Sequence, residues 1–552
     1  MESKVVDNVA MCESEEEEEE DYVINVPSNF QPNDRGLGFQ LFSSMEKYKN
    51  SVAQFITDNE GEQTYGELLK KSIRTALHLR DRGLNNNDVV MLCSNNHENS
   101  CIPFIASLFL GVPVASLDPA LSIMDTSHLL KEVTPKIMFV VSHALEMIET
   151  SLLEADIETE IVIFGSSDKY TEFADFLQFH EDEEKFIPVY VSSLQETAVI
   201  FFSSGTTGIP KGIMINHYTL MGQTDNLIYH QYDIAKCKVR QPLVAETTQM
   251  HEVTNISQSH SANDSYLEKK VKQSSFTPMQ AISSLFLSPS QAVDMVKAGR
   301  PDHLDTTSLW TCFTGGAALS EKYIETLRDL LPGCFVFQVY GQSEVAGILT
   351  QFKTNQVRDC LYLHQKPRSV GVAVAGFKYK IVDTDTEIIC GPNKPGELRV
   401  KSKFVMNGYF KKDSSESFDS DGWLRTGDVV YYDEDGCFFV VDRIKEMLKY
   451  KSWHIAPAVL EQILVNHPAV KEALVIGIPH EEDGDLPMAL LTLNDNFREK
   501  ITGQDIESYV EDKVPDRMKL RGGVKFLESF LLTPSGKVKR REMKNMILNG
   551  DI

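Results

Sequence analysis

The sequence predicts an α/β fold with a large N-terminal domain, made of layered α/β subdomains and a β-rich subdomain, followed by a small α+β C-terminal domain. Residues 30–220 alternate amphipathic helical stretches with short apolar stretches, which is typical of helices layered on a largely parallel sheet. From residue 395 the apolar stretches become short and are separated by turn residues, which indicates β hairpins. At 552 residues and 42% hydrophobic, the chain can form more than one domain and a sizeable core.

Individual elements follow from the same patterns. Residues 64–84 place apolar side chains at helical spacing with charges between them, which predicts a helix. Apolar runs at 89–93, 136–141 and 160–165 predict buried strands. The apolar run at 102–117 contains two prolines and is shorter than the roughly 18 residues that span a membrane. We therefore expect a buried helix and strand there, and no transmembrane segment.

We expect the chain to divide into three parts, at 1–29, 30–441 and 442–552. The first is an acidic, disordered tail, because residues 13–21 contain eight acids and no base, and such a run repels itself and cannot pack. The third is a compact unit with its own apolar pattern. Within the second part, residues 231–275 contain no Gly, Phe or Trp and little periodicity, which predicts an atypical, polar and partly disordered segment.

The charge balance argues against a nucleic-acid partner. The formal net charge is −26, and phosphate backbones require clustered Lys and Arg. Residues 513–552 are the exception, with ten Lys and Arg against four acids. This segment is where we expect the chain to meet a polyanionic small molecule.

The cysteine pattern and the last residues bear on the compartment. Nine cysteines are scattered singly, without paired spacings, so neither disulfides nor structural zinc are expected and a reducing compartment fits. The sequence ends in ILNGDI, without the peroxisomal tripeptide. We therefore predict a cytoplasmic protein, with the peroxisome as the alternative.

A loop rich in glycine and hydroxyl groups, SSGTTGIPKG at 203–212, follows an apolar strand predicted at 198–202. Glycines let the backbone approach a ligand, and successive N–H and hydroxyl groups form a cradle for oxyanions. Lys211 adds a positive charge suited to a phosphate. The loop is not a common P-loop, because Pro210 stands where Gly is required and residues 212–216 predict another strand instead of a helix.

Together with this loop, six further motifs resemble those of the adenylate-forming enzymes, which include acyl-CoA synthetases, 4-coumarate–CoA ligases and beetle luciferases. They are TGGAALS at 314–320, YGQSE at 340–344, GELRVKSKFVMNGYF at 396–410, GWLRTGD at 422–428, DRIKEMLKYKSWHIAP at 442–457 and TPSGKVKRR at 533–541. The resemblance covers about residues 30–545, and LRGGVKF at 520–526 is especially similar to the insect luciferase-like branch. It implies that the chain uses ATP, Mg²⁺ and coenzyme A (CoA) to convert a carboxylic acid, of fatty or aryl type, into an acyl-adenylate and then an acyl-CoA thioester.

The resemblance implies that the large domain binds the nucleotide and the acyl group. The β- and γ-phosphates would be held by residues of the glycine-rich loop: Ser203, Ser204, Gly205, Thr206, Thr207, Gly208 and Lys211. The adenine would lie in a slot between small residues and the YGQS segment, which comprise Gly315, Gly316, Ala317, Tyr340, Gly341, Gln342 and Ser343. Tyr340 would stack on the base, and Ser343 keeps the hydroxyl of the Thr that the family usually has.

Two acidic residues would complete the nucleotide site. Asp428 would accept hydrogen bonds from the ribose hydroxyls, with Arg443 as a partner to the ribose or a phosphate. Glu344 would help to hold Mg²⁺, an ion usually bound through carboxylates and phosphates, and Thr207 would add a hydroxyl ligand.

The two half-reactions require two sets of groups, which the resemblance places in a mobile C-terminal lid domain. Lys537 would stabilise the negative charge that develops while the adenylate forms. The loop around Lys449, Lys451 and Ser452 would serve thioester formation after the lid rotates about a hinge near residues 442–445.

Two departures from the family pattern leave alternatives open. A motif containing His, Phe and Gly usually follows the phosphate loop, but here the atypical segment stands in its place and the neighbours of His251 do not match. Ser452 replaces a Gly that permits close approach of CoA, and His454 replaces a Gln. The alternatives are a catalytically impaired relative that binds only nucleotide or a partner, and a luciferase-type monooxygenase.

Overall fold

The computed structural model describes eight stretches of the chain. They are residues 22–56, 61–203, 210–231, 284–301, 306–451, 453–498, 500–532 and 538–552. The acidic run at 13–21 lies outside the described residues, as does His251. The atypical segment at 231–275 also lies outside them, apart from Gln231 at the end of a helix.

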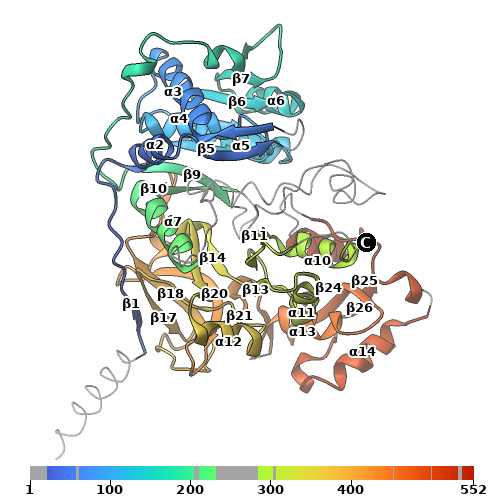
Figure 1. The fold of residues 1–552 in the computed structure, drawn as a ribbon. Coiled ribbons are helices and arrows are strands. Elements are labelled where there is room, and N and C mark those ends of the chain that lie inside the picture. Colours follow the sequence, from blue (N-terminus) through green and yellow to red (C-terminus); the bar gives the residue numbers. More distant parts are fainter. Residues whose placement is uncertain are drawn as a thin grey trace, which may run out of the picture.

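An eight-stranded sheet forms the upper part of the molecule in Figure 1. Its strands are β4 (Val90–Cys93), β5 (Val114–Leu117), β6 (Ile137–Val141), β7 (Glu160–Phe164), β8 (Thr171–Glu172), β9 (Thr197–Ser203), β10 (Lys211–Asn216) and β19 (Gly408–Tyr409). The strands in the order β9-β5-β4-β6-β7-β8 are parallel, and β10 and β19 extend the sheet beyond β9 in antiparallel pairing. The predictions of a largely parallel sheet and of its buried strands are confirmed.

Helices accompany this sheet, and the sequence predicts two of them, within residues 64–84 and 102–117. The helices are α2 (Leu37–Lys47), α3 (Tyr65–Asp81), α4 (Cys101–Phe109), α5 (Ile123–Val133), α6 (Leu145–Ala155) and α7 (His217–Gln231). Helix α3 begins after Thr64, whose side chain accepts from Glu67 N while the Glu67 carboxylate accepts from Thr64 N, so both exposed N–H groups are satisfied. The apolar run at 102–117 is α4 followed by β5, as predicted. Among the described residues, no helix has both the length and the apolar character that crossing a membrane requires.

A five-stranded antiparallel sheet forms the β-rich subdomain (Figure 1). Its order is β1 (Ile24–Val26), β17 (Phe377–Val382), β18 (Gly396–Ser402), β20 (Leu424–Tyr432) and β21 (Phe438–Arg443). The turn between β20 and β21 contains the DEDG sequence that predicts a hairpin. Strand β1 corrects one expectation, because it lies within the part assigned to a disordered tail. Ile24 and Val26 pack against the core and pair with β17, an arrangement that three residues of local sequence do not reveal.

The large domain also contains two three-stranded sheets. A parallel sheet contains β11 (Ser284–Leu287), β12 (Thr311–Thr314) and β13 (Phe335–Gln338), and an antiparallel sheet contains β14 (Tyr340–Gln342), β15 (Gly347–Gln351) and β16 (Val372–Ala373). The remaining elements of the large domain are a β hairpin and three helices: β2 (Val52–Ile56), β3 (Gly61–Thr64), α10 (Pro289–Ala298), α11 (Glu321–Leu330) and α12 (Val357–Gln365). The chain passes directly from β13 into β14, so TGGAALS and YGQSE both follow neighbouring strands of one sheet.

The C-terminal part has its own mixed sheet and hydrophobic clusters. Its elements are β22 (Leu448–Tyr450), β23 (Trp453–Ile455), α13 (Pro457–Val465), β24 (Val470–His480), β25 (Gly484–Leu493), α14 (Gly503–Glu511), β26 (Gly523–Phe526) and α15 (Arg540–Asn549). Strand β26 pairs parallel with β25, and the other pairings are antiparallel. The fold is therefore the predicted one: a large domain of α/β subdomains and a β-rich subdomain, with a small α+β domain at the C-terminus.

Candidate functional site

The glycine-rich loop connects two paired strands. Ser203 ends β9 and Lys211 begins β10, and the two residues face each other across the antiparallel pair. Both ends of the predicted phosphate loop are therefore fixed by the sheet. The loop residues Ser204, Gly205, Thr206, Thr207 and Gly208 lie outside the described residues, so their contacts with phosphate stay predictions.

Glu132 of α5 contacts the C-terminal end of this loop at Gly212, and it was not identified from the sequence. The Gly212 N–H donates to Glu132 Oε1 at 3.4 Å, and Lys412 Nζ lies 2.6 Å from Glu132 Oε2. The Glu132 side chain is 7% exposed and that of Lys412 is 32% exposed, so the carboxylate is shielded from water and the ammonium is not. The contact joins residues far apart in the sequence, and no local pattern signals it.

Lys211, Tyr409 and Glu344 form a connected group. The Lys211 ammonium lies 5.0 Å from the centroid of the Tyr409 ring. The Tyr409 hydroxyl donates a hydrogen bond of 3.1 Å to Glu344 Oε1. Burial, with a smaller contribution from the negative charge of Glu344, raises the pKa of Tyr409 to about 12, so the phenol stays protonated and can donate at neutral pH.

Glu344 lies in a turn that is fixed on two sides. It belongs to the 3₁₀ turn Ser343–Val345, and Ala346 follows with φ 53°. The Glu344 carbonyl accepts from Met406 N at 2.7 Å, and Gln223 Nε2 donates to the Val345 carbonyl at 2.9 Å. The carboxylate is thus presented by a rigid segment. An oxygen donor of this type suits Mg²⁺, and Oε2 accepts no hydrogen bond from the part of the chain that the structure describes.

Asp428 contacts two other residues predicted for the nucleotide site. The Tyr340 hydroxyl donates to Asp428 Oδ2 at 2.7 Å, and Arg443 Nε lies 3.4 Å from Asp428 Oδ1. Arg443 and Asp428 are direct partners in the pairing of β21 with β20. Burial raises the pKa of Asp428, while the Arg443 charge and the Tyr340 hydrogen bond oppose that rise. The negative charge of Glu344 also raises this pKa.

The three small residues after β12 differ in exposure, because Gly315 is buried. Gly316 and Ala317 are exposed, and Gly316 has φ 92°, which favours glycine. A Cβ atom on Gly315 would lie 2.9 Å from Val339 Cγ2, so glycine permits close packing against the chain that leads into β14. These features fit the predicted adenine slot, whose role as such remains a prediction.

Two residues of the YGQS segment, Gly341 and Gln342, have environments that bear on ligand binding. A Cβ atom on Gly341 would lie 1.9 Å from the Gly347 carbonyl oxygen, so only glycine fits between β14 and β15 there. The buried Gln342 Nε2 has no hydrogen-bond partner in the described part of the chain. Because buried donors are almost always paired, Gln342 is a candidate donor to a bound ligand.

Lys449 and Lys451, two of the residues predicted to serve thioester formation, contact acidic residues of the C-terminal part. Lys449 is in β22, and its N–H donates to Asp485 Oδ2 at 3.1 Å. Lys451 has φ 53°, and its ammonium lies 3.5 Å from Asp483 Oδ1. No contact among the described residues joins either lysine to Lys211. Ser452 and Lys537 lie outside the described residues, so their roles stay predictions.

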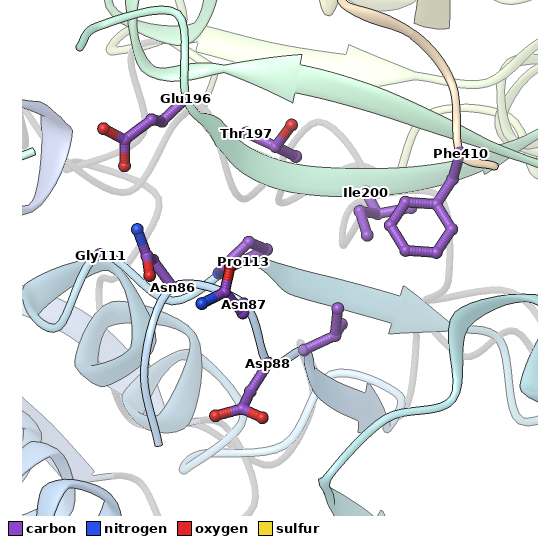
Figure 2. Close-up of a pocket in the computed structure, with 10 residues that line it drawn as sticks. Asn86, Asn87, Asp88, Gly111, Pro113, Glu196, Thr197, Ile200 and Phe410 are labelled. Atoms are coloured by element: carbon purple, nitrogen blue, oxygen red, sulfur yellow. The ribbon is translucent and has the colours of Figure 1, made fainter. Parts of the chain in front are cut away.

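A cavity of about 230 Å³ opens elsewhere, where β4, β5 and β9 begin (Figure 2). Its walls combine polar side chains from two loops with apolar ones: Asn86, Asn87, Asp88, Val89, Gly111, Pro113, Glu196, Thr197, Ile200 and Phe410. None of the residues predicted from the sequence to bind ATP or CoA lines it. It is therefore distinct from the group around Lys211, Glu344 and Asp428.

Comparison with known proteins supplies the family. The AMP-binding enzyme model matches residues 41–410, and the model of the AMP-binding enzyme C-terminal domain matches residues 459–537. Luciferin 4-monooxygenase of Photinus pyralis is 30% identical, over 95% of this chain and 96% of its own length. A 4-coumarate–CoA ligase of Humulus lupulus is 25% identical, over 96% of this chain and 97% of its own length.

Solved structures agree with these matches. The luciferase-like enzyme of the nonluminescent mealworm Zophobas morio is 36% identical, with a TM-score of 0.68, over 77% of this chain and 99% of that one. An anthranilate–CoA ligase in complex with anthranoyl-AMP shares the fold, with a TM-score of 0.75 at 18% identity, over 94% of this chain and 99% of that one. From its motifs, its fold and these matches, the chain belongs to the AMP-binding enzyme family, within the insect luciferase-like branch of the adenylate-forming enzymes.

Proposed function

We propose that this chain is an ATP-dependent acyl-CoA synthetase, which forms an acyl-adenylate from a carboxylic acid and then an acyl-CoA thioester. The observation that carries the proposal is the grouping of Lys211, Glu344 and Asp428. Tyr409 links the first two. Tyr340, four residues before Glu344, donates a hydrogen bond to Asp428. A cation and two fixed carboxylates meet the needs of a phosphate chain, its metal ion and a ribose.

In the first half-reaction, a carboxylate oxygen attacks the α-phosphorus of ATP and the bond to the bridging oxygen of pyrophosphate breaks. Lys211 would bind the departing phosphates, and Asp428 would hold the ribose hydroxyls. Glu344 would hold Mg²⁺, which when bound neutralises phosphate charge. Lys537 would approach the reacting centre and stabilise the added negative charge.

In the second half-reaction, the thiol sulfur of CoA attacks the acyl carbon, the bond from that carbon to the phosphate oxygen breaks, and AMP leaves together with the thiol proton. We place Lys449, Lys451 and Ser452 near this step. The φ of 53° at Lys451 keeps the loop tight, and the Lys451 N–H donates to the Asp483 carbonyl at 2.7 Å. Ser452 stands where the family usually has a glycine, so we expect thioester formation to be slower than in relatives that keep the glycine.

We retain the domain division at residue 442 as part of the proposal. The separate apolar clusters of the C-terminal part support it. For the compartment we retain the cytoplasm, with the peroxisome as the alternative. A CoA ligase of Arabidopsis thaliana that is 27% identical is described as peroxisomal.

The proposal is tested by incubating the purified chain with ATP, Mg²⁺ and a panel of fatty and aryl carboxylic acids. We expect pyrophosphate release that depends on the acid, and thioester formation when CoA is added. Calorimetry measures ATP binding in parallel. ATP binding without pyrophosphate release on any acid contradicts the proposal and supports the binding-only alternative.

A luciferase-type monooxygenase is the second candidate. We retain it because the luciferin 4-monooxygenases are 29–30% identical to this chain, against 25% for the 4-coumarate–CoA ligases. Oxygen uptake and light emission with luciferin, ATP and Mg²⁺ test it directly. Emission coupled to oxygen uptake supports the second candidate, and pyrophosphate release with fatty or aryl acids alone supports the first.

A further inference from the structure

Tyr409 is held rigidly between two of the predicted ATP-site residues. Its backbone lies in β19, where it is the pairing partner of Ile213 in β10. The Tyr409 N–H donates to Ser414 Oγ at 2.7 Å, and the next residue, Phe410, donates its N–H to the Gly212 carbonyl at 2.8 Å. The side chain therefore projects from a backbone that is fixed on both sides.

The two parts of the Tyr409 side chain contact opposite charges. The ring faces the Lys211 ammonium, 5.0 Å from the ring centroid, and the hydroxyl donates to Glu344 Oε1 at 3.1 Å. Within the part of the chain that the structure describes, Lys211 and Glu344 form no ion pair with each other. An ion pair between them would neutralise both groups and compete with a phosphate and a metal ion.

We propose that Tyr409 is a positioning residue that keeps Lys211 and Glu344 apart and oriented, so that the ammonium is available to phosphate and the carboxylate to Mg²⁺. The inference rests on the proposed function. The ring attracts the ammonium through the electrons of its face, which leaves the N–H groups free to donate. The hydroxyl fixes one carboxylate oxygen and leaves Oε2 for the metal ion.

Two substitutions of Tyr409 test the ring contact with Lys211 and the hydroxyl contact with Glu344 separately. Tyr409→Phe removes the hydroxyl and keeps the ring, whereas Tyr409→Leu removes both. Tyr431→Phe is the matched control, because Tyr431 stacks on Phe439 with ring centroids 4.9 Å apart. Within the ranges that the structure describes, no hydrogen bond, ion pair or ring contact joins Tyr431 to Lys211 or Glu344. Thermal unfolding of each variant shows whether the fold is retained.

The readout is calorimetric binding of ATP, first with a chelator and then with increasing Mg²⁺. We expect Tyr409→Phe to leave the dissociation constant for ATP without Mg²⁺ within about twofold of wild type. The Mg²⁺ concentration that produces half of the maximal increase in ATP affinity should rise about tenfold, which is the scale of a hydrogen bond to a charged group. Tyr409→Leu should also weaken metal-free binding about threefold. In a Glu344→Gln background, Tyr409→Phe should have no further effect on Mg²⁺ dependence.

Each result bears on the inference. If Tyr409→Phe shows the Mg²⁺ dependence of wild type and of Tyr431→Phe, the inference is wrong while the proposed function stands. If Tyr409→Phe and Glu344→Gln act additively, the hydroxyl does not act through Glu344 and the inference is also wrong. If the wild type binds no ATP with or without Mg²⁺, both the inference and the proposed function fail. If Tyr409→Leu does not fold, Tyr409→Phe still decides the matter.

Discussion

The hydroxyl of Tyr340 donates a hydrogen bond of 2.7 Å to Asp428 Oδ2, across 88 residues of sequence. This bond joins the strand that contains the YGQS segment to the strand that contains the TGD motif. Burial and the neighbouring carboxylate raise the pKa of Tyr340 well above its usual value, so the phenol remains a donor. The acceptor proposed for the ribose is therefore oriented before any nucleotide binds.

Replacing Tyr340 by Phe should weaken ATP binding about tenfold, because the Asp428 carboxylate loses a donor that fixes it. Loss of that hydrogen bond also removes an interaction that lowers the pKa of Asp428, so the carboxylate should protonate at a higher pH. Calorimetric titrations at about pH 8 and about pH 6 should show a larger loss at the lower pH. Tyr431→Phe is the control, and an unchanged dissociation constant at both values contradicts the prediction.

Replacing Lys537 by Ala should reduce adenylate formation at least about a hundredfold, the effect of removing a positioned charge from a transition state. The measurement is the single-turnover rate of pyrophosphate release. Lys539→Ala is the matched control. Lys539 pairs with Glu542, 3.0 Å away on an exposed helix end, and its loss should change the rate less than about twofold. Equal rates for the two variants would remove Lys537 from the mechanism.

Replacing Gly341 by Ala should destabilise the large domain by about 3 kcal/mol or more, because the added Cβ would lie 1.9 Å from the Gly347 carbonyl oxygen. Gly436→Ala isolates the cost of backbone conformation, since Gly436 has φ 75° and a Cβ there would meet no atom within 4 Å. We expect that variant to lose only about 1 kcal/mol. Urea denaturation measures both, and a cost at Gly341 no larger than at Gly436 contradicts the packing argument.

His217 should make the stability of the large domain depend on pH. It is 1% exposed, its Nδ1 accepts from Leu37 N at 3.3 Å, and burial lowers its pKa to about 4. Below pH 6.5 the unfolded chain binds a proton that the folded chain does not, so stability should fall as the pH drops from 6.5 toward 4. Between about pH 7.5 and about pH 5, we expect wild type to lose about 2 kcal/mol more than His217→Gln in urea denaturation. Equal losses in the two proteins would show that His217 does not titrate in this way.

The sequence predicted the elements whose signals are local. Buried parallel strands such as β6 are continuous apolar runs, and the helical spacing of apolar residues identified α3. The DEDG turn identified the β20–β21 hairpin in the same way. In each case, the interaction that forms the element lies within a few residues of sequence.

Contacts that depend on the arrangement of distant strands could not be predicted. Tyr409 is adjacent to Lys211 and Glu344 only because β19 pairs with β10 in one register. Glu132 supports Gly212 from α5, and β1 is recognisable only once β17 lies beside it. Motif resemblance identified Asp428 and Tyr340 separately, but nothing in either motif indicates that the two side chains bond to each other.

Asp442 and Arg443 are neighbours in sequence, but their side chains contact different parts of the molecule. The Asp442 carboxylate accepts from Ala458 N of α13 at 3.0 Å, whereas Arg443 pairs with Asp428 in the β-rich subdomain. Rotation of the C-terminal part about these residues would strain both interactions. The ion pair between Arg443 and Asp428 should break first, because the Arg443 side chain is half-exposed. Separation of this pair would raise the pKa of Asp428 further. The protonation of the residue proposed to hold the ribose would then depend on the position of the C-terminal part.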